Sequence, residues 1–281
     1  MPRDLADVLH YFLPEIDTES AEPKPAPLAA RLQPTSDSIP RKRMVSPELS
    51  LPLSILGLPI GDRDVVRAAL TWNLAIETAR LGASTVVVTP ASDIGSPLWP
   101  EPGRGPLGTE LVFCPATDLD GLIEVARELA HSRANDGRRG GIVFVRIPPA
   151  WLRETISAVT TRSIRWLLLL TSANRRDLSE AFELAKDMLA ASPSAEIGVT
   201  IHGVSTISEA KSAFEHLSRI SQERLGVVLA SYGLLVDDLH VYRAIAAQRP
   251  IGLAHPQAPA TRALMDVARL LYEDARSRVL G

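Results

Sequence analysis

Hydrophobic and polar positions alternate along this chain in two different rhythms. From about residue 51, short runs of apolar and β-branched residues are separated by longer stretches in which apolar residues recur every three or four positions. The short runs predict strands, and the longer stretches predict amphipathic helices. The predicted strands are 51–58, 84–89, 111–114, 141–147, 166–170, 196–202 and 226–231, and the predicted helices are 64–82, 119–131, 177–190, 206–222 and 259–277.

Two of the predicted strands are apolar at every central position. Residues 142–145 read IVFV and residues 167–170 read LLLL. Such runs indicate burial on both faces, as in a parallel sheet that helices cover from both sides. Strands alternating with helices, connected by right-handed crossovers, predict an α/β fold with three layers and a doubly wound, mostly parallel sheet. No internal repeat is visible.

The N-terminal 13 residues carry a separate apolar stripe. Its members share one side of a helix, which Pro14 ends: Leu5, Val8, Leu9, Phe12 and Leu13. A helix this short is unstable alone and needs a surface on which to bury its stripe. The sequence leaves two alternatives open, because the stripe can dock on its own domain or on a partner protein.

Residues 14–50 differ in composition from the rest of the chain. They are rich in Pro, Ser, Thr and charged residues, as in EPKPAP and QPTSDSIPRKR. Such a segment has too little apolar surface to offset the entropy lost on ordering, so we expect a disordered linker. The expected organisation is therefore a docking helix over 1–13, a linker over 14–50 and one domain over 51–281.

Composition narrows the functional class. Hydrophobic residues make up 46% of the 281 residues, and the net charge of −3 gives no general attraction to nucleic acid. The single cysteine, Cys114, suits a reducing compartment. Acids interrupt the apolar stretch at the N-terminus, and the longest purely apolar run, 166–170, is too short to span a membrane. We expect a cytoplasmic protein without a nucleic-acid partner and without stable membrane insertion.

The first strand-to-helix turn is the segment in which a doubly wound sheet would bind a ligand. A phosphate loop needs glycines, a lysine for the phosphates and a Ser or Thr hydroxyl for Mg²⁺. Here the turn offers the acids Asp62 and Asp64, whose charges would repel a triphosphate, and Ala68, which cannot bind a metal ion. Arg67 is the only cation at the start of the helix. An ordinary turn without a ligand explains these residues well.

The turn and the helix after it resemble the opening of the MinD/ParA family of P-loop ATPases and of their flagellar relative FlhG. The family's loop, GKGGVGKT, is followed several residues later by Asn-Leu-Ala, which residues 73–75 match. An ungapped count back from there puts Gly61 on the first glycine of the loop. The same count puts Asp62 on the signature lysine, Arg67 on the phosphate lysine and Ala68 on the threonine that binds Mg²⁺.

The resemblance continues in order to about residue 276. Thr89 stands where the family has the first aspartate of its Asp-Ala-Asp motif. Arg146 replaces the aspartate of the Asp-x-Pro-Pro switch, whose prolines are retained as Pro148 and Pro149. His202 stands where the family has an asparagine that reads adenine. The residues that differ from the family pattern are concentrated at positions that bind nucleotide in the family. The residues that pack the core of the fold follow the pattern.

The resemblance therefore implies a degenerate member without catalytic residues, a metal site or an intact cofactor site. The leading hypothesis is a pseudo-ATPase that regulates or scaffolds a localised bacterial machine (flagellum, pilus or surface export) through protein binding, with an oligomeric state that ATP does not control. The alternatives are a MinD-like switch that binds ATP with very slow or no hydrolysis, and a small-molecule α/β enzyme. The second alternative would need an acid/base pair at the strand ends, which the sequence does not supply.

Other features carry less weight. The six histidines form no metal-binding pattern. Cys114 follows an apolar strand and is expected in the core. The loop 95–108, with Trp99, is either a plain surface excursion or a contact loop. Asp93 lies too far past the second strand to be a convincing substitute for a lost carboxylate. The terminal helix is expected to pack one face on the core: Ala260, Leu264, Val267, Ala268 and Leu271.

Overall fold

The computed structural model describes residues 52–91, 100–134 and 140–280. The expected docking helix over 1–13, with Leu5, Val8, Leu9, Phe12 and Leu13, and the expected linker over 14–50 lie outside the described residues. So do Asp93 and Trp99.

The described residues contain one sheet of eight strands in the order β3-β4-β2-β5-β1-β6-β7-β8. All neighbouring strands are parallel except β3, which runs antiparallel to β4. The strands are β1 Ser54–Pro59, β2 Ser84–Pro90, β3 Gly103–Arg104, β4 Glu110–Cys114, β5 Gly141–Ile147, β6 Trp166–Ser172, β7 Glu196–Val204 and β8 Ala230–Val236. This arrangement confirms the predicted α/β class with a mostly parallel sheet.

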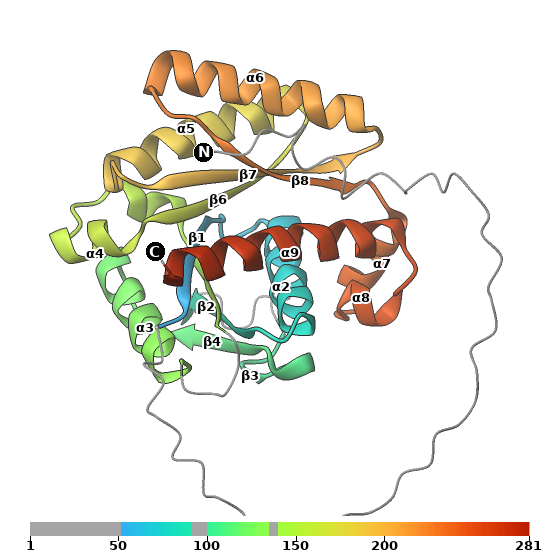
Figure 1. Cartoon of the computed structure of the whole chain (residues 1–281), viewed down its shortest axis with the longest axis horizontal. Coiled ribbons are helices and arrows are strands. Elements are labelled where there is room, and N and C mark those ends of the chain that lie inside the picture. Colours follow the sequence, from blue (N-terminus) through green and yellow to red (C-terminus); the bar gives the residue numbers. More distant parts are fainter. Residues whose placement is uncertain (1–51, 92–99, 135–139, 281) are drawn as a thin grey trace, which may run out of the picture.

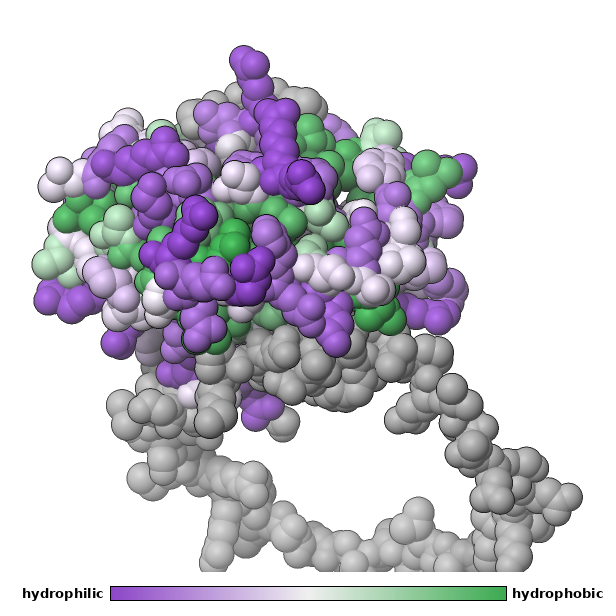
Figure 2. All heavy atoms as spheres, turned by 90° about the horizontal axis from the view of Figure 1, so that it is seen from above, coloured by the Kyte–Doolittle hydropathy of each residue, from purple (hydrophilic) through white to green (hydrophobic). Residues whose placement is uncertain are grey.

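Helices cover both faces of the sheet (Figure 1). One face is covered by α2 Val65–Arg80 and α9 Pro259–Leu280, which also pack against each other, with the shorter α7 Leu239–Ala246 and α8 Ile251–Ala254 beside them. The other face carries α3 Leu119–Ser132, α4 Ala158–Ser163, α5 Arg175–Ala191 and α6 Ile207–Leu225. Short 3₁₀ turns, η3 Pro106–Gly108 and η4 Pro149–Arg153, complete the described elements. Seen from the side of α5 and α6, the surface is mainly hydrophilic, with smaller hydrophobic areas between (Figure 2).

The core lies between the sheet and its helices. The central strand β5 is buried at every position and β6 at every position except its last, as their continuous apolar runs predict. The neighbouring strand β2 is also buried throughout. The predicted inner face of the terminal helix is also confirmed, since all five of its residues are at most 1% exposed. None of the described helices combines the length and the apolar composition needed to cross a membrane.

The last strand differs from its prediction. Residues 226–231 were expected to form it, but β8 begins at Ala230 and ends at Val236. Gly226 has a left-handed conformation (φ 69°) and closes the C-terminus of α6, as glycine commonly does at that position. The apolar run that begins there is therefore a connection, in which Val228 is 47% exposed. The prediction also missed the short helices α4, α7 and α8.

Candidate functional site

The turn between β1 and α2 lies at the carboxyl edge of the sheet, where ligands of such folds bind. Gly61 and Asp62 are in this turn. Gly61 lacks a positive φ, and an added Cβ would meet nothing within 4 Å. The local structure therefore does not require glycine at the position that the resemblance gives to the first glycine of the loop.

The N-terminus of α2 is capped by the side-chain carboxylate of Asp64. Asp64 is the N-cap residue, and its Oδ1 accepts a hydrogen bond of 2.9 Å from the backbone N–H of Arg67. The first turn of a helix has unpaired N–H groups and the positive end of the helix dipole, which together attract phosphate. Here an aspartate occupies part of that anion-binding position.

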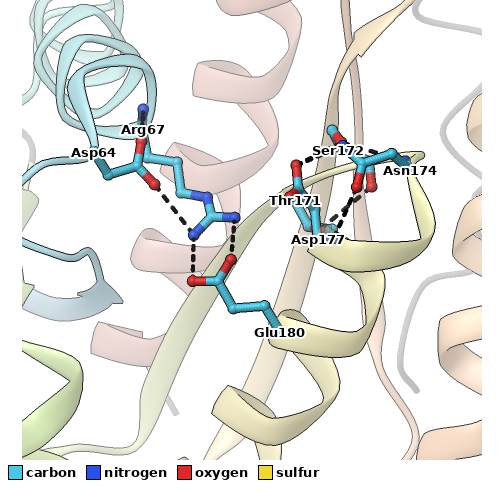
Figure 3. Close-up of polar contacts among 7 residues, drawn as sticks. All are labelled: Asp64, Arg67, Thr171, Ser172, Asn174, Asp177 and Glu180. Carbon is cyan, nitrogen blue, oxygen red and sulfur yellow. Dashed lines mark hydrogen bonds and ion pairs between the residues drawn. The ribbon is translucent and has the colours of Figure 1, made fainter.

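Arg67 is held between two carboxylates (Figure 3). Its Nη1 and Nη2 each donate to Glu180 over 3.1 Å, and Nη1 lies 3.2 Å from Asp64 Oδ2. The side chain of Arg67 is only 7% exposed. Burial acts to lower the pKa of Arg67, but the hydrogen bond to Glu180 and the charges of Asp64 and Glu180 outweigh it and raise the pKa. The cation is therefore fixed, charged and already bound to anionic partners.

Glu180 is placed by the start of α5, one turn after a closed capping network (Figure 3). Asn174 caps this helix by accepting a hydrogen bond of 2.9 Å from the N–H of Asp177. The carboxylate of Asp177 in turn accepts hydrogen bonds from Ser172 (2.7 Å) and from the amide of Asn174 (2.9 Å). The end of β6 and the first turn of α5 are thus tied together, which orients Glu180 toward Arg67.

A second ion pair joins β5 to the turn. The Arg146 side chain is 1% exposed, its Nε donates to the backbone oxygen of Ile60 over 3.0 Å, and its Nη2 pairs with the carboxylate of Asp62. The resemblance gives a lysine to position 62 and an aspartate to position 146. Both signs are reversed here, and the two residues are in contact.

Asn73, which matches the family's Asn-Leu-Ala, and the two departing positions Ala68 and Thr89 are all buried in the structure. Asn73 Oδ1 accepts a hydrogen bond of 2.8 Å from the N–H of Ile251 at the start of α8, and its amide donates to Ala69. Ala68 is 1% exposed and offers no oxygen to a metal ion. Thr89 is completely buried in β2.

His202 lies near the end of β7, on the wall of a small hollow between β8, α2 and α7. The hollow has a volume of about 20 Å³, which is room for about one water molecule and not for a purine. His202 Nε2 is buried and has no hydrogen-bond partner among the described residues. Burial, and after it the charge of Arg67, lower the pKa of His202 to about 4, although Asp64 and Asp177 act in the opposite direction.

The depressed pKa of His202 predicts a pH effect on stability. The unfolded chain binds a proton near pH 6.5 and the folded chain only near pH 4, so the free energy of unfolding falls as the pH drops through this interval. The loss should reach up to about 3 kcal/mol near pH 4, at 1.36 kcal/mol per unit. Urea denaturation at pH 7.5 and pH 4.5 would measure it, with His202→Asn as the control that lacks the loss. An imidazole that titrates near pH 6.5 in the native protein would contradict it.

The structure also places the remaining candidates. Cys114 is 1% exposed, which confirms its place in the core, and burial raises its pKa. The described part of the loop 95–108 forms β3 and η3, and Gly105 packs closely on the ring of Trp72. Among the described residues, no group of His, Cys, Asp or Glu side chains is arranged to hold a metal ion.

Sequence reasoning did not find Glu180, and it did not pair Arg146 with Asp62. Glu180 lies 113 positions after Arg67, and nothing in the local pattern of α5 sets it apart from the helix's other exposed acids. The pair of Arg146 and Asp62 did have a signal in the sequence. The resemblance implies a lysine at position 62 and an aspartate at position 146, and both charges are reversed here. A reversal at two sites is what a pair in contact would show.

The sequence matches no protein-family model and no curated protein. Solved structures do match the fold. The chain is similar to the MinD cell division protein of Aquifex aeolicus (TM-score 0.58, 16% identity, 78% of this chain and 97% of that chain). It is similar to the same organism's MinC:MinD cell division complex (0.57, 15%, 78% and 96%) and to the cell division ATPase MinD of Pyrococcus furiosus (0.54, 11%, 78% and 98%). The fold is therefore of the MinD/ParA type.

Proposed function

We propose that this chain is a MinD/ParA-type pseudo-ATPase, which acts by binding protein rather than by hydrolysing ATP. The observation that carries the proposal is that both phosphate-binding features of the turn are engaged by the chain's own carboxylates. Asp64 caps the N-terminus of α2, and Glu180 holds the guanidinium of Arg67 in a bidentate pair. A triphosphate would have to displace two anions from this position and then approach Asp62.

The missing groups support the same conclusion. Preorganised groups that stabilise charge in a transition state typically contribute about 3–4 kcal/mol each. Ala68 supplies no hydroxyl for Mg²⁺, and a buried guanidinium, Arg146, stands at the position of the switch aspartate. The hollow at His202 is too small for a purine. The missing groups therefore disfavour ATP hydrolysis, and the small hollow disfavours nucleotide binding.

The purified protein should show no Mg²⁺-dependent ATP hydrolysis above background and no rise in melting temperature with Mg-ATP. A phosphate-release assay and a thermal shift measurement check the two halves of this prediction. Arg67→Ala is the control, because turnover that persists in this variant comes from a contaminant. Turnover that disappears in Arg67→Ala would contradict the proposal, and an ATP-induced shift without turnover would favour the nucleotide-binding switch.

Assembly should also be independent of ATP. The resemblance implies a lysine at position 62 that reaches the phosphates of a second copy, and Asp62 has the opposite charge. Light scattering with and without Mg-ATP should therefore give the same mass. A shift from monomer to dimer on adding ATP would contradict this part of the proposal.

The role that we propose is that of a regulator or scaffold for a localised bacterial machine such as a flagellum, a pilus or a surface-export apparatus. One of the structurally similar proteins is a MinD bound to MinC, so this fold accommodates a protein partner. The stripe of Leu5, Val8, Leu9, Phe12 and Leu13 is the proposed contact. Cytoplasmic location, and the absence of nucleic acid among the partners, belong to the same proposal.

A further inference from the structure

Two hollows lie side by side along the amino-terminal edge of the sheet, opposite the edge that carries Arg67. Their volumes are about 550 and 480 Å³, and both are lined by Trp166, Glu196 and Arg278, at the starts of β6 and β7 and the end of α9. We call the two together the rear trough. Its inner wall is fixed by a buried chain of hydrogen bonds, in which Trp166 Nε1 donates to the Tyr232 hydroxyl over 2.9 Å and that hydroxyl donates to Asp274 over 2.6 Å.

The second hollow of the rear trough is positively charged. Arg127 from α3 and Arg165, just before β6, line it and are exposed. Neither has an ion-pair partner among the described residues, whereas Arg278 is paired with Glu196, the hollow's acid. Arg278 is also stacked on the ring of Trp166, with Cζ 4.8 Å from its centroid. Two unpaired guanidinium groups that line one hollow have the chemistry to bind carboxylates.

The chain itself carries a matching segment. Residues 15–22 read EIDTESAE, which contains four carboxylates and no cation. Pro52, where the described chain begins, is itself part of the wall of the second hollow. Along the sequence, 29 residues, 23–51, separate the acidic segment from Pro52. The linker that composition predicts would, at this length, have a root-mean-square span of roughly 30 Å, which is long enough for the acidic segment to reach the hollow.

We propose that the acidic segment 15–22 docks in the rear trough of its own chain, against Arg127 and Arg165. The tether keeps the segment at an effective concentration near the millimolar range, so a contact that is weak between separate molecules is populated within one chain. Charge complementarity favours this segment over the later part of residues 1–51, because Lys24 and residues 41–43 are positively charged like the hollow. The inference does not depend on whether the protein binds ATP.

Intramolecular crosslinking of the full chain tests the contact. In a Cys114→Ala background, Thr18→Cys is combined with Ser194→Cys, on the wall of the rear trough, or with Ser179→Cys, an exposed control on α5. A short bismaleimide should join 18 to 194 about tenfold faster than 18 to 179, because docking raises the local concentration. Salt at roughly 0.5 M should remove most of the difference.

Charge variants test the chemistry of the contact. Arg127→Glu with Arg165→Glu should lower the 18–194 rate to that of the control pair. Arg175→Glu with Arg176→Glu, the same charge change at the other edge of the sheet, should leave it unaltered. Changing the four acids of residues 15–22 to lysine in the Arg127→Glu, Arg165→Glu protein should restore it. Equal rates for the two cysteine pairs, no effect of the trough variants, or crosslinks only between chains would each overturn the proposal.

Discussion

Arg146→Asp is expected to lower the free energy of unfolding by about 3–5 kcal/mol, because it puts a carboxylate without a counter-ion at a buried position. The Arg146 side chain is 1% exposed and donates to the Ile60 backbone oxygen and to Asp62. The substitution removes both donors and puts a carboxylate beside another carboxylate. Urea denaturation at pH 7.5 would measure the loss.

The same residues predict a rescue. Asp62→Lys alone should cost less, about 1–2 kcal/mol, because a side chain at this 70% exposed position can turn to solvent and Arg146 keeps its hydrogen bond to the Ile60 oxygen. Combined with Arg146→Asp, it restores an opposite-charge pair with the signs reversed, so the double variant should be more stable than the sum of the single changes by about 1–3 kcal/mol. Arg153→Asp is the matched control, because the Arg153 side chain is 66% exposed and its ion pair with Asp187 should be worth under about 1 kcal/mol.

Additive effects in the double variant would show that Asp62 and Arg146 do not stabilise each other. We also expect no ATP hydrolysis from the double variant, although it has the charge order that the family resemblance implies. Ala68 still lacks a hydroxyl, and Glu180 still holds Arg67. Activity in this variant would mean that the charge reversal alone had silenced the site.

Leu9→Asp combined with Phe12→Asp is expected to abolish capture of the proposed protein partner. Each large apolar side chain buried in a partner's groove contributes roughly 1.5–3 kcal/mol, and two aspartates would instead have to be desolvated. Part of this gain is used to order the helix, so the starting affinity should be near micromolar. Pull-down from the native host with the full chain as bait, followed by titration of the captured protein, would measure the loss.

His10→Asp with Tyr11→Asp is the matched control, because these neighbours lie outside the stripe and receive the same two charges. The control should retain the partner, and neither variant should change the melting temperature of the domain. If the Leu9, Phe12 variant instead loses a few kcal/mol of stability and keeps its interactions, the stripe packs on its own domain.

Much of the fold could be predicted from the sequence because its signals are local. The apolar run 142–145 indicated a strand buried on both faces, and β5 lies near the middle of the sheet. The start of α6 follows from Thr206, whose hydroxyl accepts a hydrogen bond from the N–H of Glu209. The predicted start of the last strand was wrong for a local reason too, because Gly226 ends α6 instead of beginning β8.

The sequence predicted the candidate site only as a set of positions at which this chain differs from the MinD/ParA pattern. The resemblance implies nucleotide-binding groups at positions 62, 67, 68 and 146 that this sequence does not have, but it does not indicate what the side chains present there contact. The partner of Arg67 is on another helix, and its choice among the acids of α5 depends on how that helix is oriented by its capping network. Sequence separation of this size leaves no periodic signal.

The sequence by itself determined the alternation of strands and helices and the presence of Asp62, Arg67 and Ala68 around the first strand-to-helix turn, because side-chain period and residue chemistry are local properties. Only the tertiary structure decided that Glu180 pairs with Arg67, that Asp62 pairs with Arg146 and that the rear trough lies beside Pro52. Each of these contacts joins elements that are far apart along the chain. Their geometry follows from the parallel sheet, which brings the carboxyl ends of the strands to one edge and their amino ends to the other.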